Sequence, residues 1–272
     1  MKYTTVTADK TNRIDLLKKN LMASKPRIEV DRAVLLTESY MNTEGEPMVI
    51  RRAKAFANVL ENIPIVIRDH ELVVGSTAKA SRGCQIFPEF SCSWIEDEFE
   101  TLSTRSADPF DISDENKKIL AGVFKYWKGR TTSELAESYM TPETRDAIGA
   151  NIFTVGNYFF NGVGHVSVRY DKVLKIGYKG IIAEAEKELS SINPGDADYV
   201  TKSALLNAVI ISSNAAITYA NRYARLALDM AEKENDATRK KELLNIALNC
   251  SRVPANGAQT FWEACQSFWF VQ

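Results

Sequence analysis

The sequence predicts a helix-rich α/β fold. Apolar residues recur at helical spacing through most of the chain, and short β-branched runs follow Pro64. The 272 residues, 45% of them hydrophobic, are enough to bury a sizeable core in one large domain or two small ones. Neither an internal repeat nor a low-complexity linker occurs, so the sequence predicts no domain boundary.

Three helices are expected in the first part of the chain. The first runs from about Asp9 to Ala23, where Lys25-Pro26 breaks its apolar periodicity. The second begins at Asp31, and Glu46-Pro47 supplies the start of the third, since proline is favoured in the first helical turn. These two form a helical pair joined near Gly45.

The region after Pro64 predicts less regular structure. Ile65–Ile67 and Leu72–Gly75 are β-branched runs that favour short strands or extended segments. The charged corner between them, which holds His70, is expected to be solvated. Ser76 to Ser93 has few periodic positions and predicts a long structured loop, a feature that is often functional.

The second half of the chain is predicted to be mainly helical. Ser113 or Asp114 is a start signal for one helix, and Lys128-Gly129 is a stop signal. Asn193-Pro-Gly-Asp196 is a strong turn. The expected helices are Trp94–Leu102, Asp114–Trp127, Thr131–Met140, one starting at Thr141-Pro142, Tyr170–Leu189, Tyr199–Lys233 and Asp236–Cys250.

The last segment, Phe261–Gln272, is an apolar, aromatic-rich helix that ends without a cap, a charge or a glycine. Two interpretations stay open: a C-terminal helix docked in a core, or a cut through a longer protein. The aromatic cluster of Trp262, Phe268, Trp269 and Phe270 is expected to be core.

Composition excludes several classes of function. The balance of 34 Lys and Arg against 35 Asp and Glu gives a net charge of -1, so no strong field recruits nucleic acid or an acidic membrane. A small neutral substrate fits this balance better. No apolar run approaches the roughly 20 residues that span a bilayer, and the start lacks the apolar centre of a secretory signal, so the cytoplasm is expected.

The four cysteines are too few and too scattered for a disulfide framework, and free, mostly buried thiols are expected. Cys84 and Cys92 have no matching pair at zinc-ligand spacing. With only two histidines in the chain, no metal site is predicted.

His165 is the most promising substrate contact. It follows glycines in the stretch Phe153–Val168, where it is one titratable group among aromatic and β-branched residues. A neutral imidazole donates at one nitrogen and accepts at the other, which suits a hydroxyl group. The alternative is a buried histidine that is satisfied by backbone groups.

Four further residues are candidates around it. Asn157 is either a second hydroxyl contact or a turn residue beside Gly156. Gly162 and Gly164 would let a small ligand approach the backbone closely. They do not form a dinucleotide fingerprint, because the third glycine and a βαβ unit are absent. Glu89 is either a buried carboxylate that supports the site or a structural anchor.

Seven segments follow one another in a fixed order: Arg32–Tyr40, Thr43–Pro47, Ile67–Gly75, Phe87–Phe90, Tyr126–Leu135, Gly156–His165 and Ile217–Tyr223. Together they resemble the N-terminal part of the pyruvate formate-lyase-like superfamily of glycyl radical enzymes, and within it the diol dehydratase branch. Shorter blocks at 82–84, 105–110 and 195–199 resemble the propanediol side of that branch more than the glycerol side.

This resemblance implies that residues 1–272 form the N-terminal part of a ten-stranded α/β barrel, incomplete in this chain, without the C-terminal glycyl radical domain. It implies a lyase that converts propane-1,2-diol to propanal, with His165 and Asn157 holding the hydroxyls. In the family, an activating enzyme that uses S-adenosylmethionine and an iron–sulfur cluster installs the glycyl radical, and a cysteine in a Gly-Cys-Val-Glu-like loop relays it. Neither this cysteine loop nor the Arg-Val-x-Gly-Tyr-like sequence of the radical glycine occurs here. The 272 residues alone are therefore expected to bind no cofactor and to be inactive.

Other readings stay open. Glycerol dehydratase or choline trimethylamine-lyase are alternatives within the family, and a catalytically inactive, stand-alone helical binding or scaffold protein is the alternative of another class. The resemblance also implies a homodimer at full length and an anaerobic, cytoplasmic enzyme, with packaging in a bacterial microcompartment left open.

Overall fold

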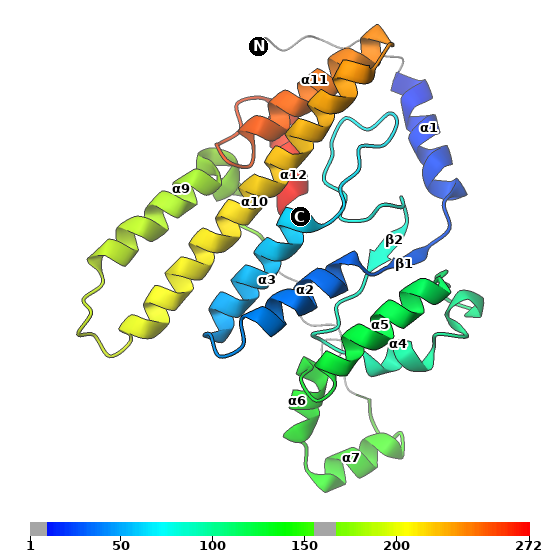
Figure 1. The fold of residues 1–272 in the computed structure, drawn as a ribbon, viewed down its shortest axis with the longest axis vertical. Helices are drawn as coiled ribbons and strands as arrows, with labels where there is room; N and C mark the ends of the chain where they lie inside the picture. Colours follow the sequence, from blue (N-terminus) through cyan, green and yellow to red (C-terminus); the bar gives the residue numbers. More distant parts are fainter. Residues whose placement is uncertain (1–9, 155–166) are drawn as a thin grey trace. The chain divides into compact units, whose positions relative to one another are not determined.

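The computed structural model describes residues 10–154 and 167–272, which form mainly α-helices (Figure 1). Two strands and a short 3₁₀ helix accompany them. The elements are α1 Lys10–Ala23, β1 Arg27–Glu29, α2 Asp31–Asn42, α3 Met48–Asn62, β2 Gly83–Gln85, α4 Ser93–Asp97, η1 Leu102–Thr104, α5 Asp114–Trp127, α6 Thr132–Ser138, α7 Pro142–Gly149, α9 Tyr170–Ser191, α10 Tyr199–Lys233, α11 Ala237–Arg252 and α12 Phe261–Val271.

The chain divides into two compact units. Unit 1 comprises Met1–Ser24, Glu38–Ser81 and Val168–Gln272, and unit 2 comprises Lys25–Thr37 and Arg82–Ser167. The first boundary between the units after β1 lies between Thr37 and Glu38, inside α2. A boundary inside a helix has no Gly-rich or Pro-rich linker to mark it in the sequence. This is why the sequence predicts no boundary.

Unit 1 is built around α10, which packs against α3, α9 and α11. The buried side of α10 is rich in alanine, including Ala215, Ala220 and Ala227, which are at most 1% exposed. Small side chains let the neighbouring helices approach closely. The predicted long helices at Tyr199–Lys233 and Asp236–Cys250 are confirmed.

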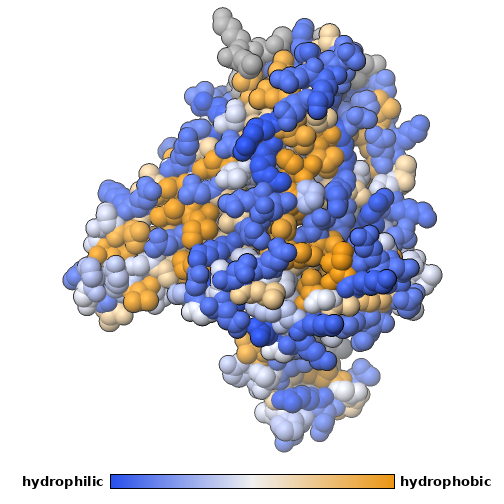
Figure 2. Space-filling view, viewed as in Figure 1, coloured by the Kyte–Doolittle hydropathy of each residue, from blue (hydrophilic) through white to orange (hydrophobic). Residues whose placement is uncertain are grey.

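Within the described residues, α10 is long and apolar enough to cross a bilayer by length and composition alone. Its packing against three helices of unit 1 accounts for part of that apolar composition, since 33% of the apolar window is buried. Val200, Leu205 and Leu228 of α10 are exposed. Figure 2 shows such apolar surface, in orange, over α9 and α10.

Helix α9 is interrupted at Gly177, whose φ of 65° and ψ of 178° are not helical. The loop after α11 fills the interruption. The amides of Tyr178 and Lys179 donate to the carbonyls of Pro254 and Ala255 at 2.8 and 2.9 Å, and the amide of Ala258 donates to the Leu174 carbonyl at 2.9 Å. The predicted helix from Tyr170 is therefore confirmed, but with a break that its apolar pattern does not reveal.

Residues 67–76, which we call the clamped segment, contain no strand. Short strands or extended segments were predicted at Ile65–Ile67 and Leu72–Gly75, and neither run is a strand in the structure. Side chains bond this backbone where a strand partner would otherwise do so. The side-chain amide of Gln266 in α12 accepts from the amide of Val74 at 3.0 Å and donates to the Val74 carbonyl at 2.6 Å. Of the two predicted alternatives, short strands or extended segments, the strands do not form, because β-branched composition does not supply a neighbouring strand.

Donors from other helices of unit 1 satisfy further carbonyls of the clamped segment. Tyr223 in α10 donates to Ser76, and Trp262 in α12 donates to Leu72, at 2.6 and 3.0 Å. Arg13 in α1 donates to the His70 carbonyl at 2.8 Å, and Arg239 in α11 donates to the carbonyls of Arg68 and Glu71. Both arginines also pair with Glu242, whose side chain is 2% exposed.

The aromatic residues of α12 were all expected to lie in the core, and the structure shows that this is wrong for two of them. Phe268 and Trp269 are 43% and 48% exposed, whereas the polar Glu263 and Gln266 are buried. The polar side chains are inside because each bonds backbone. Glu263 completes a capping box with Thr260, and Gln266 pairs with the clamped segment.

Unit 2 contains the parallel pair β1–β2, in which Ile28 lies opposite Cys84. Each strand has three residues, too few to show an alternating pattern, so the sequence missed both. Helix α5 packs beside them. Asn116 donates to the Ile28 carbonyl at 3.0 Å, and the Trp127 indole donates to Thr37 Oγ1 at 2.8 Å.

Polar side chains define the helix ends in unit 2, as the sequence predicts. Ser113 caps α5 by accepting from the amide of Asn116, and Thr131 forms a capping box with Glu134 at the start of α6. Thr141 caps α7 ahead of Pro142. Two helices end earlier than expected. The helix predicted at Trp94–Leu102 ends at Asp97 in α4, with the 3₁₀ turn η1 after it, and the helix predicted at Thr131–Met140 ends at Ser138 in α6.

We predict that Gly177→Ala lowers the free energy of unfolding by about 1–3 kcal/mol or more, the cost of a backbone conformation that is essentially restricted to glycine. An added Cβ would also lie 2.5 Å from the Ala255 carbonyl oxygen. Chemical denaturation with far-ultraviolet circular dichroism measures the change. The control is Gly122→Ala in α5, where a Cβ meets open space and should add about 0.5–1 kcal/mol of stability. Equal effects of the two substitutions would contradict the interpretation.

Candidate functional site

The candidate substrate contacts lie outside the described residues. His165, Asn157, Gly162 and Gly164 all fall in 155–166, so their roles stay predictions. Glu89 is the one candidate of the set within the described ranges. Two features of the described residues can be examined as parts of a site: the loop that holds Glu89, and a cavity in unit 1.

Glu89 is held by a two-pronged ion pair with Arg32. The Nη1 and Nη2 groups of Arg32 donate to the two carboxylate oxygens at 3.1 and 2.5 Å. The side chains of the two residues are 16% and 13% exposed. Because both oxygens accept from one planar guanidinium, this carboxylate is engaged as an anion and is not a free general base.

Arg32 also fixes the loop on which Glu89 lies. Its Nη1 donates to the Ile86 carbonyl at 3.2 Å, and its guanidinium carbon lies 3.6 Å from the centre of the Phe87 ring. The backbone amide of Arg32 donates to the side chain of Gln85 at 3.0 Å. One residue at the start of α2 thus organises the whole stretch from the end of β2 to Glu89.

The same loop is attached to α6 through its backbone. The amides of Thr132 and Ser133 donate to the carbonyls of Glu89 and Phe90 at 2.9 and 3.0 Å. These two amides belong to the first turn of α6, where helical backbone donors have no partner within the helix. Glu89 is therefore set on a rigid support.

The thiols near this loop are not activated nucleophiles. Burial raises the pKa of the Cys92 thiol to about 11, with further contributions from the nearby carboxylates of Glu134 and Glu96. Burial also raises the pKa of Cys84. All four cysteines are free, as predicted, although Cys84 and Cys265 are only partly buried. A protonated thiol is neither a good nucleophile nor a metal ligand.

Nowhere in residues 10–154 and 167–272 do three His, Cys, Asp or Glu side chains gather in a way that would hold a metal ion. The partner of Glu89 is instead an arginine. The described groups of this loop hold backbone in place and include no cluster of metal-ligating side chains.

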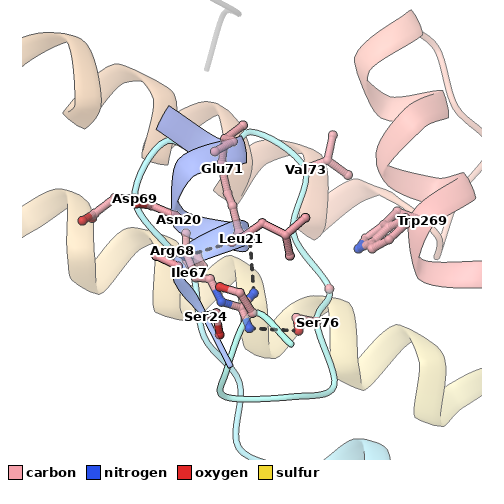
Figure 3. Close-up of a pocket in the computed structure, with 14 residues that line it drawn as sticks. Asn20, Leu21, Ser24, Ile67, Arg68, Asp69, Glu71, Val73, Ser76 and Trp269 are labelled. Atoms are coloured by element: carbon pink, nitrogen blue, oxygen red, sulfur yellow. Dashed lines mark hydrogen bonds and ion pairs between the residues drawn. The ribbon is translucent and has the colours of Figure 1, made fainter. Parts of the chain in front are cut away.

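A larger cavity of about 920 Å³ lies in unit 1 beside the clamped segment. Figure 3 shows that α1, the clamped segment and α12 contribute its lining, with Leu21, Val73 and Trp269 as apolar examples. Its one lining arginine, Arg68, is engaged. The Arg68 guanidinium pairs with Glu71 at 3.1 Å and donates to the Ala78 carbonyl at 2.7 Å. Polar residues such as Asn20, Asp69 and Ser76 also line this cavity, so its surface is mixed, and its arginine is already bound to Glu71 and to backbone.

The sequence missed the connecting role of Arg32, and no local signal reveals it. Arg32 and Glu89 are separated by 57 positions, and only folding brings them together. His70 was expected at a solvated corner. The structure makes it half-buried, with a positive φ of 68°.

Comparison with known proteins identifies the family. The sequence profile described as pyruvate formate lyase-like matches residues 6–272. The chain belongs to this family. Its members include glycyl radical enzymes, so the resemblance stated from the sequence is confirmed.

Among curated relatives, the chain is 35% identical to the (2S)-3-sulfopropanediol dehydratase of Klebsiella oxytoca, over 95% of this chain and 32% of that protein. A solved structure on 1,2-propanediol dehydration in Roseburia inulinivorans is 55% identical, with a TM-score of 0.94 over 99% of this chain and 32% of that one. The glycerol-bound glycerol dehydratase of Clostridium butyricum is 52% identical, with a TM-score of 0.93 over 99% of this chain and 34% of that one.

The chain thus spans about a third of the length of the family members that it matches. The helix-rich α/β fold corresponds to the N-terminal portion of glycyl radical enzyme structures, as predicted.

We predict that Arg32→Met destabilises unit 2 by about 3 kcal/mol or more, since it leaves the Glu89 carboxylate buried without its charged partner. Thermal and urea unfolding of the purified chain measure this loss. The matched control is Arg145→Met, because Arg145 is exposed on α7 and donates to a backbone carbonyl only. An Arg32 variant as stable as the Arg145 variant would show that the ion pair does not hold the loop.

A second prediction concerns Cys92. Raising its pKa from the ordinary 9.0 to about 11 should make its thiolate about 10²-fold rarer at pH 8. Alkylation by iodoacetamide, followed peptide by peptide with mass spectrometry, should therefore be at least ~10²-fold slower in the folded chain than in urea. The folded rate should keep rising with pH above 9, where the unfolded rate levels off. Similar rates in both states would refute the assignment.

Proposed function

We propose that this chain forms the substrate-binding N-terminal part of a glycyl radical dehydratase that removes water from a 1,2-diol, converting propane-1,2-diol to propanal. The observation that carries the proposal is the 55% identity, over 99% of this chain, with the Roseburia inulinivorans structure described for 1,2-propanediol dehydration. Identity at that level across the whole chain favours a shared substrate class.

In this proposal, His165 and Asn157 bind the two hydroxyl groups of the diol. A cysteine thiyl radical takes the hydrogen atom from C1, the C2 hydroxyl leaves as water, and return of a hydrogen atom to C2 gives the aldehyde. His165 assists the step in which the C–O bond breaks, because a donor at the departing oxygen makes hydroxide a better leaving group. Gly162 and Gly164 leave space for the small substrate.

The geometry around Glu89 supports this division of roles. Its carboxylate is occupied by Arg32, so Glu89 would support the site as an anchor of the loop, and the base would be another residue. The radical-bearing glycine and the relay cysteine have no matching motif in these 272 residues. They would belong to the part of the enzyme that lies beyond the matched third.

Glycerol is the second candidate substrate, because the similar Clostridium butyricum enzyme was solved with glycerol bound. Full activity would need a partner enzyme that uses S-adenosylmethionine and an iron–sulfur cluster to install the radical. We propose a homodimer in the cytoplasm for the complete enzyme, with a microcompartment as a possible setting to be tested by fractionation.

The test uses a complete enzyme in which these 272 residues are followed by the family's relay cysteine and radical-bearing glycine. This enzyme is first activated under anaerobic conditions. Propane-1,2-diol, glycerol and choline are then compared as substrates by gas chromatography of the products. Propanal formed at the highest kcat/KM supports the proposal. Faster turnover of glycerol selects the second candidate, and trimethylamine release or no turnover with any diol overturns it.

We predict that His165→Ala in that enzyme lowers kcat by ~10²-fold or more, the usual scale for a positioned acid–base group. The control is His70→Asn at the only other histidine, since asparagine tolerates the positive φ of this position. The control should keep normal turnover. Wild-type turnover in the His165 variant would remove His165 from the mechanism.

A further inference from the structure

A cavity of about 250 Å³ lies within unit 2, beside the loop of Glu89. Four aromatic residues, Phe87, Phe90, Trp94 and Phe110, line it, and the buried residues Ile28 and Leu102 also contribute to the lining. At ~30 Å³ for each water, the volume equals about eight water molecules. It is the right size for a one-ring molecule.

Contacts with Arg32 and with each other hold the rings of Phe87 and Phe90 in place. The Arg32 guanidinium covers the Phe87 ring at 3.6 Å, and Phe87 stacks with Phe90 at 6.3 Å between ring centres. Because Arg32 is itself fixed by Glu89, the ring positions are set before any ligand binds. Preorganised aromatic walls favour a planar apolar ligand, since little side-chain freedom is lost on binding.

One cation, Arg105, lines the cavity. Its Nη1 lies 3.2 Å from Glu98 Oε2, but that oxygen has no hydrogen-bond partner among the described residues. The contact is thus an ion pair without hydrogen-bond geometry. Within the described ranges the guanidinium makes no hydrogen bond, and its side chain is 36% exposed. Glu98 contacts Nη1, and the other N–H groups of the guanidinium can donate to an anionic group.

We propose that this cavity binds a small aromatic carboxylate, with its ring between the aromatic walls and its carboxylate on the Arg105 guanidinium. The aromatic residues provide dispersion and stacking, and Arg105 provides a charge-assisted, two-pronged hydrogen bond. A neutral ring compound would gain only the first of these. A cationic one would be repelled by Arg105, although the same rings attract cations.

The experiment uses the 272-residue chain and three matched probes: phenylacetate, 2-phenylethanol and phenethylamine. Isothermal titration calorimetry gives the affinities, and the indole N–H resonance of Trp94 reports where the probe binds. We expect saturable binding of phenylacetate, a shift of the Trp94 resonance, and at least ~10-fold weaker binding of the alcohol and the amine, the scale of a charge-assisted hydrogen bond.

Arg105→Gln should weaken phenylacetate binding by at least ~10-fold while leaving the weak binding of 2-phenylethanol unchanged. Arg145→Gln, at an exposed arginine outside the cavity, should leave all three affinities unchanged. The unchanged alcohol affinity distinguishes a loss of charge from a loss of fold. Absence of saturable phenylacetate binding, an unmoved Trp94 resonance, or equal phenylacetate affinity in the Arg105 variant would each overturn the proposal. Diol turnover is not read in this assay, so its outcome is independent of the dehydratase proposal.

Discussion

Side-chain hydrogen bonds to the backbone of residues 67–76 are the constraint on which unit 1 depends. Buried carbonyl and amide groups need partners, and this clamped segment has neither a helix nor a neighbouring strand to provide them. Gln266, Tyr223 and Trp262 supply the partners from α10 and α12. Each bond joins positions far apart in the chain, so the helices and the segment hold one another in place.

Arginine has the same connecting role in both units. Arg13 and Arg239 approach the clamped segment and share the buried carboxylate of Glu242, while Arg32 joins α2 to the loop of Glu89. A guanidinium has five donors in a fixed plane, so one side chain can bond a carboxylate and a carbonyl together. The described carboxylates at these points are neutralised by such pairs, and they are therefore structural.

This use of charge bears on the proposed chemistry. Diol dehydration requires a donor at the departing hydroxyl and a base elsewhere, and Glu89 is not free for either role. The requirement directs attention to His165, the histidine that lies outside the charged corner of the clamped segment. Arg105 differs from Arg13, Arg32 and Arg239. It is in an ion pair with Glu98 but makes no hydrogen bond within the described residues.

The sequence by itself determined where most helices lie and where they begin, because these depend on local signals. Ser113, Thr131 and Thr141 cap helices where the sequence places them, and Gly45 and Gly129 adopt positive φ values where turns were predicted. The family was also readable from ordered segments of the chain. For the candidate site, the sequence indicated which residues could bind a hydroxyl but not how they are arranged. His165 and Asn157 were selected for their hydrogen-bonding groups and for the family resemblance.

Tertiary structure alone decided the rest. The strands β1 and β2 exist because Arg27–Glu29 and Gly83–Gln85 meet, and neither run shows a strand pattern by itself. Leu72–Gly75 has the pattern of a strand but receives side chains instead of a partner. The break of α9 at Gly177 and the pairing of Arg32 with Glu89 likewise arise from contacts across long stretches of chain. Local propensity fixes how a segment prefers to fold, whereas burial of its polar groups depends on which distant residues arrive beside it.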